Sequence, residues 1–258
     1  MGTKGTAYKW QFKARFRRNA LLEAERYQDL LDLLELAPNQ MWHYRQFGVA
    51  ALAAMGKKAE AIRYAEEGRG PNDSPLAVAR ACEEVLLTCG FADEAYHRYG
   101  LQANRAGTYL AWFRAVRKKY PHMTPERILA DLVKETPGEE GKWFAAAKDV
   151  KLFDEAIALA NRTPCSPQTL TRAARDFAEK NPGFAVEAGM AALHWLVEGY
   201  GYEITSLDVV DAYRHTMKAA ENEGRADEVD RRIRDLVAGG SSDGRFVKKI
   251  LDRKLRLS

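Results

Sequence analysis

The chain has 258 residues, of which 46% are hydrophobic and 29% charged, and these proportions are ordinary for one or two globular domains. Its net charge is +4, with +6 in residues 1–18, +5 in residues 245–258 and therefore −7 in the body between them. Three cysteines give no even disulfide framework, and no run of roughly 18–20 apolar residues could span a bilayer, so we expect a cytoplasmic protein without membrane contact.

The first 19 residues form a basic segment in which aromatic and cationic side chains are interleaved. One interpretation is an amphipathic helix whose aromatic side chains cap the rest of the fold. The alternative is a nucleic-acid-binding arm, because cations neutralise phosphates while aromatic rings stack on unpaired bases. We favour the capping helix, since an acidic body does not supply the long positive groove that nucleic acid requires. The residues of the alternative site are Lys9, Trp10, Lys13, Arg15, Arg17 and Arg18.

A short pattern then recurs five times: a turn residue, two spacers, acidic residues and a small or apolar residue. The successive spacings are 31, 34, 61 and 73 residues, close to one or two periods of the 34-residue tetratricopeptide helix pair. Glycine at the turn ends a first helix, and acidic residues favour the positive end of the second helix. The sequence therefore predicts an all-α fold, a right-handed α-solenoid of helix hairpins over about residues 20–238. The five turn residues are Glu25, Gly56, Gly90, Lys151 and Gly224.

Further helices are marked by their caps. Three pairs of a capping residue and proline predict helix starts, at Thr124-Pro125, Ser166-Pro167 and Asn181-Pro182. We expect Ser206 to cap a helix over 207–223, and a terminal helix over 245–255. The loop at 136–141 divides the solenoid, residues 20–258, into possible lobes 20–136 and 141–258.

Two predicted first helices carry the residue types that anchor binding partners. Residues 42–47 and 109–118 are rich in aromatic residues and arginines, and helical spacing turns Tyr109, Phe113 and Val116 inward. The simpler interpretation is a set of core aromatics beside solvated cations. The loop at 199–203, with two tyrosines between glycines, is a further candidate. We expect a protein or peptide partner to contact Tyr44, Arg45, Arg114, Arg117 and Lys118.

No pattern points firmly to catalysis, a cofactor or a metal. Asp208, Asp211 and His215 share one helix face and carry ligand atoms, but a solvated polar face explains them more simply. Cys165 at a helix start and His194 in an apolar helix are best explained as structural residues. No glycine-rich phosphate loop follows a strand. We interpret one more group, Cys82, Cys89 and His97, in the same structural way.

Residues 20–68 and 81–100 resemble tetratricopeptide hairpins, with Glu25 and Lys151 replacing the turn glycine. Residues 143–160, the run Thr163-Pro164-Cys165-Ser166-Pro167 and residues 246–253 resemble the helical tail of bacterial SWIM zinc-finger-associated proteins. The SWIM zinc motif is missing, so no zinc function is implied. Residues 12–20 also resemble the N-terminus, and the chain from Leu21 its C-terminal half, of a longer bacterial helical-repeat family. This resemblance implies a shortened member, natural or engineered, and no established activity.

These observations favour a non-catalytic helical-repeat scaffold that binds a protein or peptide, with nucleic-acid binding as the alternative. Stacked helix pairs create an extended surface lined mainly by the first helix of each pair. The basic ends and the acidic body predict at most weak self-association.

Overall fold

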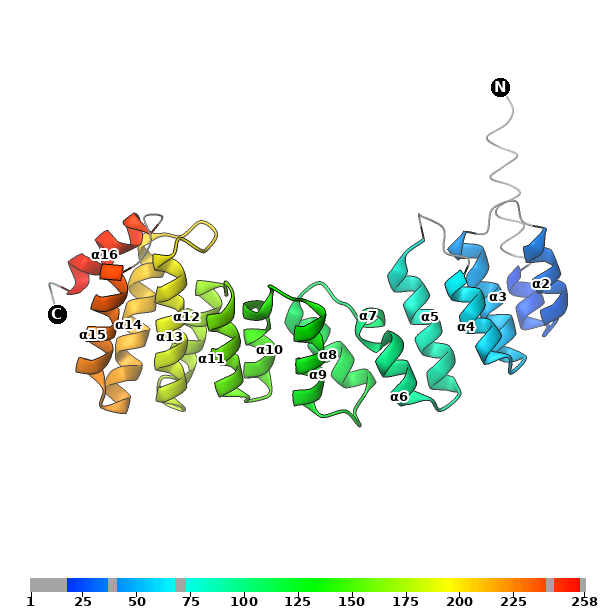
Figure 1. Cartoon of the computed structure of the whole chain (residues 1–258), viewed down its shortest axis with the longest axis horizontal. Helices are drawn as coiled ribbons and strands as arrows, with labels where there is room; N and C mark the ends of the chain where they lie inside the picture. The colour runs from blue at the N-terminus through cyan, green and yellow to red at the C-terminus, as the bar shows by residue number, and fades with distance from the viewer. Residues whose placement is uncertain (1–17, 37–40, 68–72, 240–243, 256–258) are drawn as a thin grey trace, which may run out of the picture. The chain divides into compact units, whose positions relative to one another are not determined.

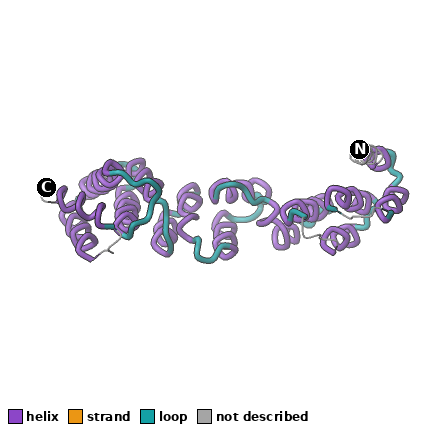
Figure 2. Tube along the Cα trace, turned by 90° about the horizontal axis from the view of Figure 1, so that it is seen from above, coloured by secondary structure: helices purple, strands orange, loops and turns teal. Residues whose placement is uncertain are grey.

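A computed structural model describes residues 18–36, 41–67, 73–239 and 244–255. Within these ranges every regular element is a helix and no strand occurs (Figures 1 and 2). The all-α prediction is therefore confirmed for the described part of the chain. No helix in these ranges combines the length and the apolar character that crossing a bilayer would require.

The described residues group into two compact units. Unit 1 ends at Ala106 and also includes Lys118–Tyr120, and unit 2 comprises Gly107–Arg117 and the chain from Pro121 onward. The predicted dividing loop at 136–141 thus lies inside unit 2. The described part of unit 1 begins in a helix over 18–23, which is followed by α2 (Tyr27–Glu35), α3 (Trp42–Ala54), α4 (Lys58–Glu67), α5 (Pro75–Thr88), α6 (Ala92–Ala95), the π-helical turn η1 (Tyr96–Gly100) and α7 (Leu101–Ala103).

Unit 2 holds the remaining described helices, among them the two longest, α13 (Pro182–Val197) and α14 (Ser206–Glu223). Helix α8 (Tyr109–Lys119) contributes most of its length here. It is followed by α9 (Pro125–Glu135), the 3₁₀ turn η2 (Glu140–Trp143), α10 (Phe144–Asp149), α11 (Phe153–Arg162), α12 (Pro167–Phe177), α13 (Pro182–Val197), α14 (Ser206–Glu223), α15 (Ala226–Gly239) and α16 (Arg245–Leu255). The terminal helix coincides with its predicted range.

The same chain reversal occurs at all five copies of the recurring pattern. Each turn residue has a left-handed backbone, with φ between 57° and 78°. Its N–H donates to the carbonyl three residues earlier, and the next residue's N–H donates to the carbonyl five residues earlier, which is the Schellman pattern of a helix end. The carbonyl of that next residue then accepts the first backbone hydrogen bond of the following helix. We call this arrangement the joint; it occurs at Glu25, Gly56, Gly90, Lys151 and Gly224.

The first turns of the second helix hold each joint in place. Acidic residues occupy the first turn, where they face its unpaired N–H groups. Five residues after the turn residue comes a side chain with 0% exposure, packed between the two helices of the pair. These buried residues are Leu30, Ala61, Ala95, Ala156 and Val229.

Helices pack on their sequence neighbours and on the next helix but one. Contacts of the first kind join α3 with α4, α10 with α11, and α12 with α13. Contacts of the second kind join α3 with α5, α12 with α14, α13 with α15, and α14 with α16. Figure 1 shows α12 to α15 standing side by side within unit 2. Helix α13, buried on most of its surface, occupies the centre of this group.

Three of the four predicted helix caps are confirmed, and the fourth lies one residue earlier in the sequence than predicted. The side chains of Thr124, Ser166 and Asn181 each accept a hydrogen bond from a backbone N–H in the first turn of their helix. Helix α14, however, is capped by Thr205 and begins at Ser206, because Thr205 and Asp208 form a reciprocal capping box. The prediction of Ser206 as the cap was wrong by one residue.

The two joints without glycine give a direct test of their energetics. We expect Lys151→Gly and Glu25→Gly each to raise the free energy of unfolding by roughly 0.5–1 kcal/mol. Glycine removes a left-handed strain of about 1–2 kcal/mol, although it also makes the unfolded chain more flexible. Urea unfolding followed by circular dichroism measures the change.

The matched control is Ala130→Gly at an exposed position in the middle of α9, which should lower the same free energy by about 1 kcal/mol. If Lys151→Gly destabilised the chain as much as this control, the left-handed joint would not carry the strain assigned to it.

Candidate functional site: a groove between α12 and α14

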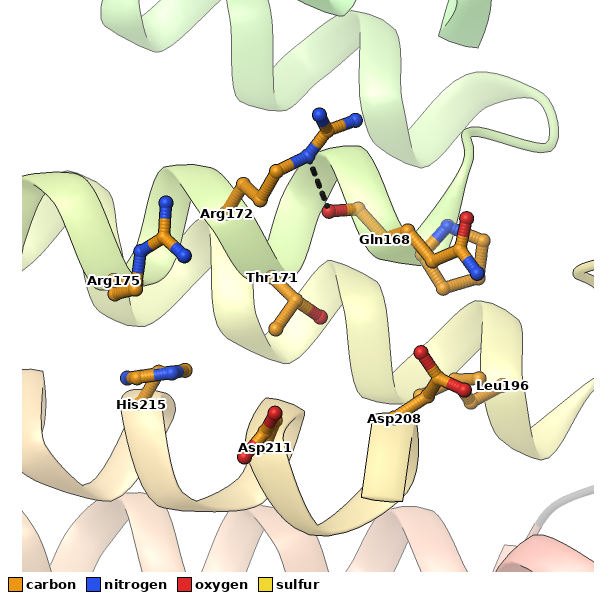
Figure 3. Close-up of a pocket in the computed structure, with 9 residues that line it drawn as sticks. Gln168, Thr171, Arg172, Arg175, Leu196, Asp208, Asp211 and His215 are labelled. Atoms are coloured by element: carbon orange, nitrogen blue, oxygen red, sulfur yellow. Dashed lines mark hydrogen bonds between the residues drawn. The ribbon is translucent and has the colours of Figure 1, made fainter. Parts of the chain in front are cut away.

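Helices α12 and α14 run side by side over α13 and leave a groove between them (Figure 3). The groove is half open and has a volume of about 370 Å³, within the range of small ligand sites. Its walls are mostly polar, and the floor includes the apolar side chain of Leu196 from α13. The lining residues are Pro167, Gln168, Thr171, Arg172, Arg175, Leu196, Asp208, Asp211 and His215.

The α12 wall presents two exposed arginines, three residues apart on one helix face. Arg172 donates from Nε to the Gln168 carbonyl at 3.2 Å and from Nη2 to Thr169 Oγ1 at 3.3 Å, both within its own helix. Arg175 bonds to its neighbour Asp176 at 2.9 Å, with half of each side chain exposed. An exposed pair of this kind contributes little free energy, so both guanidinium groups can turn to a ligand at small cost.

The α14 wall presents two carboxylates. Asp208 accepts hydrogen bonds from the backbone and hydroxyl of Thr205, which lower its pKa, with a smaller contribution from Gln168 on α12. Asp211 pairs with Arg214 at 2.9 Å on the same helix. Both side chains are only partly buried and Figure 3 shows them directed toward α12. This wall is therefore anionic at neutral pH.

His215 continues the α14 wall one turn beyond Asp211. Burial lowers the pKa of His215, and Arg214 and Arg175 lower it further against the opposing effect of Asp211 and Asp176. The imidazole is thus neutral at pH 7 and can both donate and accept a hydrogen bond.

The arginines of α12 and the carboxylates of α14 line the same groove without pairing with each other, and Figure 3 shows the guanidinium group of Arg172 directed away from α14. Among the residues that line the groove, every ion pair lies within one helix, and none joins α12 to α14. In the described part of the chain, no group of three or more His, Cys, Asp or Glu side chains is arranged to hold a metal ion. The arrangement suits a ligand that carries hydrogen-bonding or charged groups on two sides.

The α14 wall of this site was identified from the sequence. Helical spacing placed Asp208, Asp211 and His215 on one face, and the structure brings all three to the groove. The α12 wall was missed. The spacing of Arg172 and Arg175 on a proline-started helix was visible, but local sequence patterns do not show which side chains of α12 lie beside α14.

In unit 1, the predicted partner residues on α3 differ in exposure. Tyr44 is half-buried, and the guanidinium of Arg18 lies 4.0 Å from the centroid of its ring. Arg45 was expected at the surface but is only 2% exposed, with its guanidinium 5.0 Å from the Tyr64 ring. Its Nε and Nη1 atoms are buried without a hydrogen-bond partner. Arg45 therefore belongs to the core of unit 1, because helix spacing turns it toward α4.

The predicted partner residues on α8 are more accessible. Phe113 and Val116 are buried and Arg114 and Lys118 are exposed, as the helical spacing predicts, whereas Tyr109, also expected to point inward, is only half-buried. Arg114 forms a two-pronged salt bridge with Asp149, whose carboxyl pKa it lowers. The half-buried Arg117 lies over the ring of Phe113.

The alternative nucleic-acid residues Lys9, Trp10, Lys13, Arg15 and Arg17 lie outside the described residues. Arg18 is described, and it is only 6% exposed against the Tyr44 and Phe47 rings. A cation in this position stabilises the fold of unit 1 and does not present its charge to a phosphate backbone.

The thiol of Cys165 is also withdrawn from solvent. It is 4% exposed, and burial raises its pKa to about 12. The thiol form therefore predominates at neutral pH, which agrees with the structural role expected for this residue.

No protein-family model matches the chain, and no curated protein or solved structure is significantly similar to it. The ligand of the groove therefore has to be inferred from the chemistry of its own residues.

The imidazole of His215 reports on the groove. Its pKa, followed by NMR titration, should lie below the usual value of about 6.5. Arg175→Gln should raise it and Asp211→Asn should lower it further. Because the folded state binds this proton more weakly, the stability that His215 contributes is complete above pH 6.5 and is lost as the pH falls below it. Equal pKa values in all three proteins would contradict this geometry.

The buried guanidinium of Arg45 predicts an unusual substitution effect. Arg45→Met keeps the aliphatic stem and removes two buried donors without acceptors, so it should raise the free energy of unfolding by about 1 kcal/mol. Arg45→Ala should lower it, since it leaves a cavity. Urea unfolding distinguishes the two substitutions. If Arg45→Met lowered the free energy of unfolding as much as Arg45→Ala, the cation itself would stabilise the core.

Proposed function

We propose that the chain is a tetratricopeptide-like α-solenoid and a non-catalytic scaffold that binds an extended peptide segment of a partner protein between α12 and α14. The packing supports the solenoid part of this proposal. Helices that are next but one in the chain contact each other, α3 with α5 in unit 1, and α11 with α13, α12 with α14 and α13 with α15 in unit 2. Translational stacking of helix pairs has this pattern of contacts.

The position of the groove is the observation that carries the binding proposal. By alternation along the chain, α12 and α14 are the first helices of consecutive pairs, α12–α13 and α14–α15. First helices line the binding surface of solenoid proteins. A polar groove of about 370 Å³ between two of them is therefore placed where a partner segment would lie.

Exposed aromatic residues extend the groove at one end. The loop between α13 and α14 carries Tyr202, which is 82% exposed, and Tyr200, whose ring packs edge-on against Trp195. A Cβ atom on Gly201 of this loop would lie 3.6 Å from Pro167, at the start of the α12 wall. Aromatic residues beside a polar groove match the composition of peptide-binding sites, where large rings supply contact area and polar groups supply orientation.

A site-specific cross-link tests the proposal. Random peptides displayed on phage are selected on the immobilised full chain, and binders are then cross-linked to variants carrying a photoreactive benzoylphenylalanine. Gln168 at the groove should capture the selected peptides, because its exposed side chain lines the groove.

The control position is Asp235, equally exposed on α15, a second helix. Capture at Asp235 with none at Gln168, or failure to select any peptide, would overturn the proposed function.

A further inference from the structure

We infer that the groove selects an extended peptide in which acidic and basic side chains alternate. This inference rests on the proposed function and adds the chemical class of the ligand. It starts from the opposite charges of the two walls, cationic along α12 and anionic along α14, which remain unpaired across the groove.

The cationic wall offers donors of matching geometry. Arg172 and Arg175 lie three residues apart, about 4.5 Å along the helix axis, and their hydrogen bonds are made within α12. A guanidinium group binds a carboxylate through two parallel N–H···O bonds, which favours acidic side chains along this wall. Thr171, directed into the groove between them, adds a hydroxyl to the same wall (Figure 3).

The anionic wall repeats this spacing with the opposite sign. Asp208 and Asp211 are also three residues apart, and both point toward α12. Each carboxylate retains acceptor capacity beyond the bonds that Thr205 and Arg214 donate. Lysine or arginine side chains would therefore be favoured on this side. His215, neutral at pH 7, leaves the charge of the wall to the two carboxylates.

An extended peptide presents its side chains to the two walls in turn. Successive side chains of a strand point to opposite sides, so every second residue faces the same wall. The repeat on each side is about 6.6 Å, and the flexible arginine side chains can span the difference from the helix spacing. Alternating acidic and basic residues then place each charge against its opposite.

Repulsion makes the selection specific. A uniformly acidic peptide would meet Asp208 and Asp211, and a uniformly basic one would meet Arg172 and Arg175. A peptide with the same composition in two blocks pairs only part of its charges. Specificity of this kind depends on the mismatched contacts as much as on the matched ones.

Fluorescence anisotropy with four labelled hexapeptides tests the inference on the full chain at low salt. The peptides are alternating Glu-Lys, the block isomer with three Glu followed by three Lys, hexa-Glu and hexa-Lys. The alternating peptide should bind roughly tenfold more tightly than its block isomer, as expected for several exposed ion pairs acting together. Its affinity should fall as salt screens these pairs.

A charge swap gives the sharper comparison. In the double variant Arg172→Glu and Arg175→Glu both walls are anionic, so the preference should move from the alternating peptide to hexa-Lys. The control variant Lys134→Glu and Arg231→Glu makes the same change in net charge on α9 and α15, away from the groove. This control variant should bind the four peptides in the same order of affinity as the wild type.

Equal binding of the alternating and block peptides, or the same shift toward hexa-Lys in the control variant, would overturn the inference. If the four peptides fail to bind while phage-selected peptides still cross-link at Gln168, the alternating-charge inference is wrong and the proposed function stands. If the four peptides fail to bind and no selected peptide cross-links at Gln168, both the inference and the proposed function are wrong.

Discussion

The left-handed residue between paired helices is the constraint on which the rest of this structure depends. At each joint, two backbone hydrogen bonds close the first helix and the next carbonyl opens the second, so the chain reverses over very few residues. A short reversal gives the two helices little freedom in their relative position. The buried residue five places later, such as Ala61 or Ala156, then fixes how closely they approach. Five copies of one local geometry thus give the chain a repeated helix pair.

The groove lies between α12 and α14, which are next but one in the chain, and only the connection that follows α14 is one of the five joints. In the proposed stacking of helix pairs, first helices lie beside first helices, and any difference between neighbouring first helices gives the groove two unlike walls. Here α12 supplies guanidinium groups and α14 supplies carboxylates. Charges of opposite sign that are not paired with each other lower the cost of binding a ligand with the complementary pattern, because only exposed ion pairs within each helix have to be broken. Arg114 and Asp149, on α8 and α10, show the contrasting case in which such charges satisfy each other within unit 2.

The local structure was largely predictable from the sequence, including two joints that lack glycine. Glu25 and Lys151 were identified by the residues around them, because the acids and the small residue after each turn encode the second helix. The caps at Thr124, Ser166 and Asn181 were equally visible, since side-chain capping is a local interaction. Features predictable in this way depend on contacts within about six residues.

The site was less predictable because it depends on contacts between distant segments. Asp208 and Arg172 are far apart in the sequence, and helix periodicity places each on a face without saying which face it meets. The same limit applies to Arg45, which was predicted at the surface and is buried. Its charge suggested the surface, but Gly48, one turn further along α3, lets the ring of Tyr64 approach closely, and the guanidinium is covered.

The most direct test of the binding surface is an NMR titration that follows the arginine Nε–Hε signals of the full chain as an alternating Glu-Lys peptide is added. We expect the signals of Arg172 and Arg175 to move in a saturable way while those of Arg232 and Arg234, on the second helix α15, stay in place. Shifts at the α15 arginines with unchanged signals from α12 would contradict the claim that stacked first helices form the binding surface.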